Sequence, residues 1–265
     1  MEWIAGYVAI GAAVGFFAGM LGMGGGAIAI PLLALLFERQ GLPREHLLHL
    51  AVASSMAAIL FTSISSVRAH ASRGAVNWHI ARRITPGILL GGLTGAGIAG
   101  FFTTRAFAIF FTAFIYLAAT SILLDLRPKP ARELPGAKGM FAAGFGISSV
   151  SALAGIGGAV FVVPYLLWCN VTMIQAIGTA SLIGFPIAAA ATTGYIVTGL
   201  MTQGLPQWSL GFLYLPATAG MVIASMLTAP LGARAAHAMP TTLLKRVFAV
   251  LMYAIATRML IKLWG

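Results

Sequence analysis

The feature that most constrains the fold is a succession of long apolar stretches with few or no charged residues. A helix needs about 20 mainly apolar residues to cross the hydrocarbon core of a bilayer. The mainly apolar stretches near that length are 3–21, 49–67, 84–102, 106–124, 140–154, 176–200, 208–231 and 243–263; the last of them carries four basic residues. Two further stretches, 27–37 and 160–169, are too short to cross, because a helix rises only about 1.5 Å per residue. None of them alternates as a membrane β-strand does, so we predict an all-α polytopic membrane protein.

Composition supports this fold class and excludes others. The chain is 60% hydrophobic and 8% charged, whereas soluble domains average about 45–50% apolar and about 25% charged residues. The net charge of +11 comes from basic residues in short loops between apolar stretches, as the positive-inside rule describes, so we expect no nucleic-acid partner. We therefore expect a multi-pass membrane protein, with the lipid bilayer as its surroundings.

The two halves of the sequence resemble each other. LGMGGGAIAIPLL, from residue 21, matches AGIGGAVFVVPYL, from residue 154, and AVASSM, from residue 51, matches AIGTASL, from residue 176. RGAVNW then matches QGLPQW, and FTAFIYLAATSIL matches FAVLMYAIATRML. Four matching blocks in the same order indicate an internal duplication. We therefore divide the chain into a first transmembrane repeat (1–124), a cytoplasmic linker (125–138) and a second transmembrane repeat (139–265).

The basic residues predict that the repeats have opposite orientations. Loop 67–83 carries four arginines, whereas its counterpart 199–207 carries no basic residue. Loop 103–105 carries one arginine, whereas its counterpart 232–246 carries three basic residues. Because cytoplasmic loops are enriched in Lys and Arg, we expect 67–83, the linker and 232–246 to be cytoplasmic and 199–207 to be external. Each repeat is then a glycine-broken hairpin, made of one long and one short helix, followed by three long transmembrane helices.

The glycine-rich hairpin tips are the predicted substrate site. Irregular backbone in a membrane is tolerated where protein or a water-filled cavity covers it, and a helix N-terminus favours an anion. Inverted repeats with broken helices are common in secondary transporters. The predicted substrate-binding residues, at the tips and at the neighbouring hydroxyls, are Gly22, Gly24, Gly25, Gly26, Ala27, Ser54, Ser55, Gly155, Gly157, Gly158, Ala159, Thr179 and Ser181.

Other interpretations of these residues were weighed. The tip glycines could serve only close helix packing, which is the role we predict for the scattered pair Gly91 and Gly95. No Asp or Glu lies within a long stretch, which disfavours cation coupling through a carboxylate. His49 and His70, near the ends of stretch 49–67, are interpreted as interfacial groups, and Cys169 as a small buried hydrophobic residue.

The sequence also bears on function class. It has no H-E-x-x-H zinc motif, no G-x-S-x-G elbow and no paired intramembrane aspartates, so we predict no enzyme, no catalytic residue, no metal and no cofactor. An anion-selective channel is the main alternative to a carrier, and an intramembrane enzyme is a weaker one.

A family resemblance agrees with this interpretation. AGMLGMGGGAIAIPLL (18–33), ALAGIGGAVFVVPYL (152–166), the AVASSM and IGTASL pair and HASRGAVNW (70–78) together resemble the sulfite exporter TauE/SafE family of membrane transporters. Members move small sulfur-containing anions, such as sulfite and sulfoacetate. The resemblance therefore implies an anion carrier of the bacterial inner (plasma) membrane, with inverted repeats and a small anionic (organo)sulfur substrate. One departure is Ala53, which stands where the second copy has glycine.

Overall fold

The computed structural model describes residues 2–21, 25–72, 74–124, 131–238 and 241–264. These residues form helices α1 (Glu2–Leu21), α2 (Gly26–Arg39), α3 (Leu47–Ala71), α4 (Trp78–Gly100), α5 (Thr104–Leu123), α6 (Ala137–Ala154), α7 (Ala159–Trp168), α8 (Met173–Leu200), α9 (Leu215–Ala238) and α10 (Thr241–Trp264). Two short strands, β1 (Ser209–Leu210) and β2 (Leu213–Tyr214), pair as an antiparallel hairpin between α8 and α9.

The predicted apolar stretches coincide with the observed helices. The short stretches 27–37 and 160–169 become the short helices α2 and α7. Within the described residues, the segments long and apolar enough to cross a membrane are Leu47–Arg68, Thr104–Ser121, Met173–Leu200 and Leu215–Gly232. Together with the helical content, these segments identify a multi-pass helical membrane protein.

One stretch is not helical over its whole length. We predicted an uninterrupted helix over 208–231, but residues 209–214 form the β1–β2 hairpin and α9 begins only at Leu215. Trp208 and Gly211 both have a positive φ, of 67° and 57°. A right-handed α-helix needs a negative φ at every residue, so no helix continues through these two positions. The prediction was wrong here because apolar content does not report backbone handedness.

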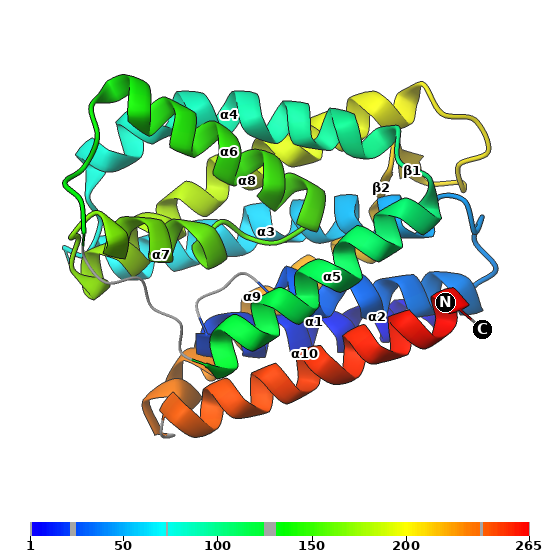
Figure 1. Ribbon diagram of the computed structural model, residues 1–265. Coiled ribbons are helices and arrows are strands. Elements are labelled where there is room, and N and C mark those ends of the chain that lie inside the picture. Colours follow the sequence, from blue (N-terminus) through cyan, green and yellow to red (C-terminus); the bar gives the residue numbers. More distant parts are fainter. Residues whose placement is uncertain (1, 22–24, 73, 125–130, 239–240, 265) are drawn as a thin grey trace.

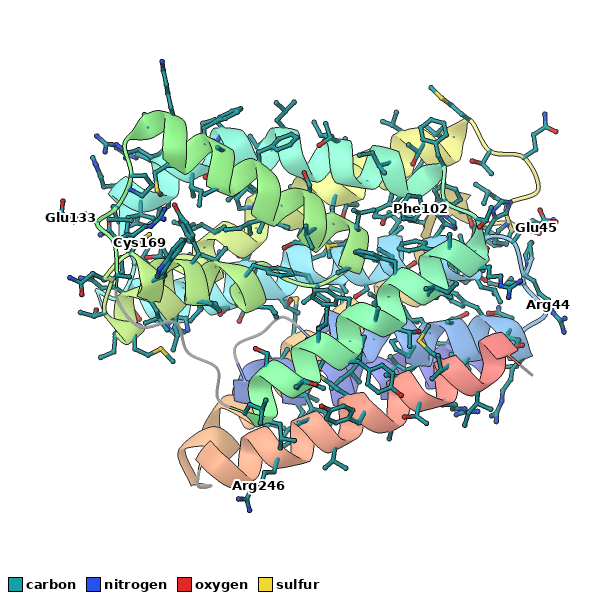
Figure 2. All side chains as sticks on the ribbon, in the orientation of Figure 1. Arg44, Glu45, Phe102, Glu133, Cys169 and Arg246 are labelled. Carbon is teal, nitrogen blue, oxygen red and sulfur yellow. The ribbon has the colours of Figure 1, made fainter. Side chains whose placement is uncertain are left out.

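The helices lie side by side with their connections gathered at two opposite ends (Figure 1). One end holds both termini, the α2–α3 connection and the β1–β2 hairpin, while the opposite end holds the linker residues that precede α6 and the α7–α8 connection. Helix α1 therefore starts at the first end and α2 finishes there, whereas α6 starts and α7 finishes at the second end. Figure 2 shows the exposed side chains of Arg44 and Glu45 at the first end and Glu133 at the second.

Two helix pairs pack closely along glycine-lined faces. Helix α1 packs along α9, and α4 packs along α6. A Cβ atom added to Gly91 of α4 would lie 2.2 Å from the carbonyl oxygen of Phe145, and one added to Gly95 would lie 2.4 Å from that of Ser149. Only glycine permits such an approach, so the predicted packing role of Gly91 and Gly95 is confirmed.

Helix α3 is the most enclosed of the candidate spans. In its apolar stretch, Leu47–Arg68, 78% is buried, against 33% for Thr104–Ser121 of α5. Helix α3 packs against α2, α8 and α9, whereas α5 packs mainly on α10 along one side of the molecule (Figure 1). The functional features described below lie on α3 and on the hairpin tips that surround it.

Candidate functional site

The tip of the first hairpin is formed by the start of α2. Gly25 precedes the helix with φ of 63°, a conformation that glycine adopts without strain. The carbonyl oxygen of Gly25 accepts the first helical hydrogen bonds, from the amides of Ile28 and Ala29 at 3.1 and 3.0 Å. Gly26 and Ala27 are buried, and their amides precede these first bonds. The predicted site residues Gly22 and Gly24 lie outside the described residues.

The tip of the second hairpin is built in a similar way. Gly155 ends α6 with φ of 62°, and Gly157 and Gly158 are buried in the turn that leads into α7. The carbonyl oxygen of Gly158 accepts from the amides of Phe161 and Val162 at 3.1 and 2.8 Å, as Gly25 does at the start of α2. Ala159, the first residue of α7, is partly exposed.

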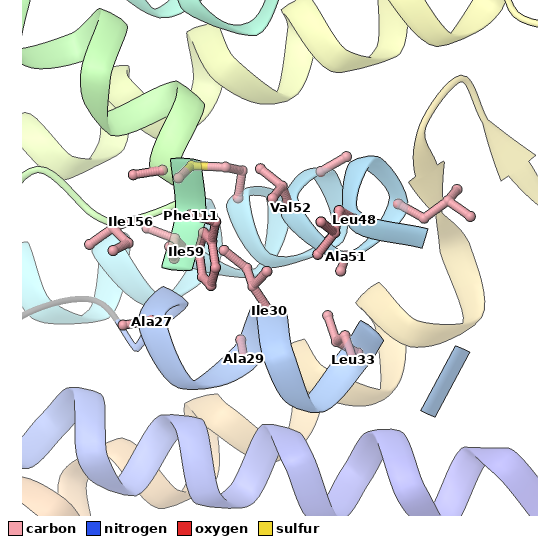
Figure 3. Packing of buried hydrophobic residues seen from close by; sticks show 14 of the residues in the cluster. Ala27, Ala29, Ile30, Leu33, Leu48, Ala51, Val52, Ile59, Phe111 and Ile156 are labelled. Carbon is pink, nitrogen blue, oxygen red and sulfur yellow. The ribbon is translucent and has the colours of Figure 1, made fainter. Parts of the chain in front are cut away.

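The two tips touch each other. A Cβ atom added to Gly26 would lie 2.2 Å from the carbonyl oxygen of Gly155, so the backbones meet with no room for a side chain. One added to Gly155 would lie 2.3 Å from Cδ1 of Ile30 and 3.0 Å from a methyl group of Val52. Figure 3 shows Ile30 and Val52 in this packing, with Ile156 next to Ala27. The structure thus brings together glycines that the sequence only paired by analogy.

Two of the predicted hydroxyls hold backbone at equivalent places. The amide of Tyr214, just before α9, donates to Ser54 Oγ at 3.2 Å. The amide of Asn77, just before α4, donates to Thr179 Oγ1 at 2.9 Å. Both hydroxyls are buried. Ser54 and Thr179 therefore each anchor the start of a long helix from the other half of the chain, a role that the sequence did not reveal.

Ser55 is placed differently. Its side chain is 1% exposed, and within the described residues its Oγ has no hydrogen-bond partner. It lines a cavity of about 10 Å³ between α1, α2, α3 and α9, together with small apolar residues and the hydroxyl-bearing Thr62 and Ser225. Those two hydroxyls donate to backbone carbonyls of their own helices. A buried hydroxyl without a protein partner is costly in a membrane protein, so Ser55 is the predicted hydroxyl that is free to bind a substrate.

The remaining predicted hydroxyl, Ser181, donates to the carbonyl oxygen of Ile177 at 3.0 Å and is 8% exposed. Its bond lies within α8, as is common for serine in helices. In the described structure Ser181 therefore makes a local contact and is not brought to the touching tips by any hydrogen bond.

The interpretation of His49 as an interfacial group was wrong. Its side chain is 2% exposed, and its Nε2 lies 2.9 Å from the carbonyl oxygen of Ala99 in the last turn of α4. The sequence signal was its position between Leu48 and Leu50, but position on a helix cannot tell whether a neighbouring element covers it. The interpretation of Cys169 as a buried residue is confirmed, since it is 5% exposed.

Comparison with known proteins places this chain among membrane transporters. The model of the sulfite exporter TauE/SafE family matches residues 7–259. A probable membrane transporter protein of Haemophilus influenzae is 32% identical over 258 residues, which is 96% of each chain. The probable membrane transporter protein YdhB of Bacillus subtilis is 26% identical over 239 residues, covering 88% of this chain and 90% of the relative.

A more distant relative comes from an archaeon. A probable membrane transporter protein of Methanocaldococcus jannaschii is 25% identical over 237 residues, covering 85% of this chain and 83% of the relative. No solved structure matches the chain.

Proposed function

This chain belongs to the sulfite exporter TauE/SafE family of membrane transporters, and we propose that it is a secondary transporter that moves a small inorganic or organic sulfur anion, such as sulfite or a sulfonate, by alternating access. The proposal places substrate at the touching hairpin tips. The observation that carries it is the contact between Gly26 and Gly155, which joins the two irregular segments of the chain at one point inside the helical bundle.

The packing of the helices supports a two-fold relation between the halves. In the proposed duplication α1 corresponds to α6 and α4 to α9, and the observed pairs α1–α9 and α4–α6 exchange under that correspondence. The matched bonds of Ser54 and Thr179 to the residues that precede α9 and α4 exchange in the same way. Two halves related in this manner can rock against each other around a fixed central site.

The chemistry proposed for the tips is that of helix N-termini and hydroxyls. Helices α2 and α7 begin at Gly26 and Ala159, and the first amides of a helix carry a partial positive charge of roughly half an elementary charge. The proposed ligands are the first amides of these helices and other backbone groups of the tips, from Gly22, Gly24, Gly25, Gly26, Ala27, Gly155, Gly157, Gly158 and Ala159, together with the hydroxyls of Ser54, Ser55, Thr179 and Ser181.

The cavity beside Ser55 is smaller than the proposed substrate. The cavity beside Ser55 has about 10 Å³, which is at the lower limit for a single water molecule and too small for sulfite. Contact between Ser55 and the substrate would therefore require α1, α2, α3 and α9 to move relative to one another, and alternating access supplies such a movement.

The experiment is flux into proteoliposomes, with radiolabelled sulfite and sulfoacetate as separate probes. We expect saturable uptake that is accelerated when the same unlabelled anion is placed on the opposite side. The matched variants are Ser55→Ala and Ser65→Ala, because Ser65 lies on the same helix and is partly exposed. Ser55→Ala should raise the apparent KM at least several-fold with unchanged protein folding, whereas Ser65→Ala should transport as the wild type does.

The same assay separates the alternatives. An anion channel would show flux that neither saturates nor responds to unlabelled anion on the opposite side. An enzyme would convert the probe, which analysis of the recovered sulfur compounds would detect. Absence of uptake of both probes, with folded protein in the membrane, would contradict the proposed substrate class.

A further inference from the structure

A buried histidine that the proposed site does not use lies on the same helix as Ser55. His49 is 2% exposed, and its imidazole is stacked on Phe212 with ring centroids 4.9 Å apart. On another side it contacts Phe107 of α5, with centroids 5.0 Å apart. An imidazole inside an aromatic enclosure of a membrane protein is unusual, because polar side chains in membranes are expensive and generally functional.

The hydrogen bonds of His49 define its protonation state. A carbonyl oxygen only accepts, so Nε2 carries the proton that is donated to Ala99 at 2.9 Å. Within the described residues the other ring nitrogen, Nδ1, is buried and has no partner. This arrangement fits a neutral imidazole, with Nε2 held by Ala99 and Nδ1 able to accept a proton.

The surroundings can accommodate a positive imidazole. Ala99 belongs to the last turn of α4, where the helix dipole favours a cation. The faces of Phe107 and Phe212 also attract a cation. What the enclosure lacks is a counter-charge, because no Asp or Glu lies within the described candidate membrane spans.

The other titratable and charged groups on the surrounding elements do not supply that counter-charge. On the α2–α3 connection, the ring of His46 lies 6.5 Å from that of His49, and Arg44 and Glu45 are exposed at this end of the molecule (Figure 2). On α5, Arg105 is exposed. On the β1–β2 hairpin, the Tyr214 hydroxyl accepts a hydrogen bond from the side-chain amide of Gln40 at 3.2 Å. On α4, the last turn has no basic residue.

His49 lies one helical turn from the hairpin tips. Residues three apart are neighbours on a helix surface and are separated by about 4.5 Å along its axis, so Val52 neighbours both His49 and Ser55 on α3. Val52 is the residue whose methyl group faces Gly155. An anion at the tips would therefore be the negative charge closest to His49 inside the bundle.

We propose that His49 binds a proton together with the transported anion, so that this carrier moves the two in the same direction. The inference rests on the proposed function. Anion and proton stabilise each other because opposite charges attract most strongly in a water-free environment. By linkage, each must raise the affinity for the other by the same factor. In this scheme His49 replaces the carboxylate that the membrane spans lack.

The experiment uses wild-type protein in liposomes that contain a pH-sensitive dye, with the membrane potential held at zero and sulfoacetate as the probe. Sulfoacetate does not change charge between about pH 6 and pH 8, where histidine titrates. We expect a sulfoacetate gradient to carry protons inward with it. An imposed pH gradient should drive sulfoacetate accumulation of about tenfold per pH unit, as expected for one proton per anion.

Variants then assign the proton to one residue. His49→Gln retains a donor for the carbonyl of Ala99 but cannot titrate, so it should allow downhill sulfoacetate flux without proton movement. His46 precedes α3 and His70 lies near its far end. The variants His46→Gln and His70→Gln should still move protons together with sulfoacetate. Sulfoacetate flux without proton movement in the wild type, or coupling that survives in His49→Gln, would overturn the proton site while leaving the proposed function intact. No flux of sulfoacetate or sulfite in the wild type would contradict both proposals.

Discussion

Replacing Gly26 by alanine should force the two hairpin tips apart. The added Cβ would lie 2.2 Å from the carbonyl oxygen of Gly155, so one backbone segment must retreat by about 1 Å to reach ordinary contact. Overpacking of this kind costs about 1–3 kcal/mol. The higher helix propensity of alanine offsets up to about 1 kcal/mol, and less at the first residue of a helix. We therefore expect a net loss of about 1–2 kcal/mol, a five- to thirty-fold shift toward the unfolded state.

The assay is thermal unfolding of purified protein in detergent, monitored as the fraction of protein that remains monodisperse at each temperature. For a chain of this size, each kcal/mol corresponds to roughly 2–4 °C in Tm, so Gly26→Ala should melt roughly 2–8 °C below the wild type. Gly97→Ala is the matched control, since a Cβ at Gly97 of α4 meets nothing within 4 Å, and it should melt at or slightly above the wild type. Equal melting temperatures for Gly26→Ala and the wild type would refute the described contact between the tips.

Three further predictions concern other parts of the molecule. In a Cys169→Ala background, an impermeant thiol reagent should label cysteines introduced at Glu133 and at Gln203 from opposite sides of the membrane; labelling of both from one side would contradict the proposed topology. Gly211→Ala places a Cβ 2.2 Å from a backbone oxygen of α8 at a residue with φ of 57°, so it should lower the free energy of unfolding by about 2–5 kcal/mol. Gly204→Ala, with φ of 78° and open space around it, should lower it by about 1–2 kcal/mol. Equal Tm values for the two variants would argue against docking of the β1–β2 hairpin on α8. Burial raises the pKa of the Cys169 thiol, so less thiolate is present at a given pH. Alkylation of Cys169 in the wild type should therefore be slower than that of an ordinary cysteine near pH 8, and it should accelerate only at higher pH. Rapid alkylation at neutral pH would show that the thiol is not buried.

The apolar stretches alone were sufficient to predict the helices, including the two short ones. Stretches 27–37 and 160–169 became α2 and α7 with boundaries shifted by one or two residues. This succeeded because a membrane-spanning segment must be both apolar and internally hydrogen-bonded, which leaves the helix as the solution for a chain without barrel strands. The family was also evident from its glycine motifs, and the comparisons confirm it.

The β1–β2 hairpin and the environment of His49 could not be obtained from the sequence. Residues 209–214 are as apolar as a helix, and their conformation depends on close backbone contact with α8: a Cβ on Gly199 would lie 2.1 Å from the amide nitrogen of Phe212. That docking in turn places Phe212 over His49.

The contacts at the proposed site were likewise decided by the tertiary structure. Sequence determined that glycine-broken tips and nearby hydroxyls exist, because local backbone freedom and residue type are properties of the chain itself. Only the packing of α3 against its neighbours decided that Ser54 holds the start of α9, while the adjacent Ser55 faces a cavity without a partner. The physical reason is that adjacent residues on a helix point about 100° apart. Which of two adjacent serines meets a backbone amide and which meets a void therefore depends on helices distant in the sequence.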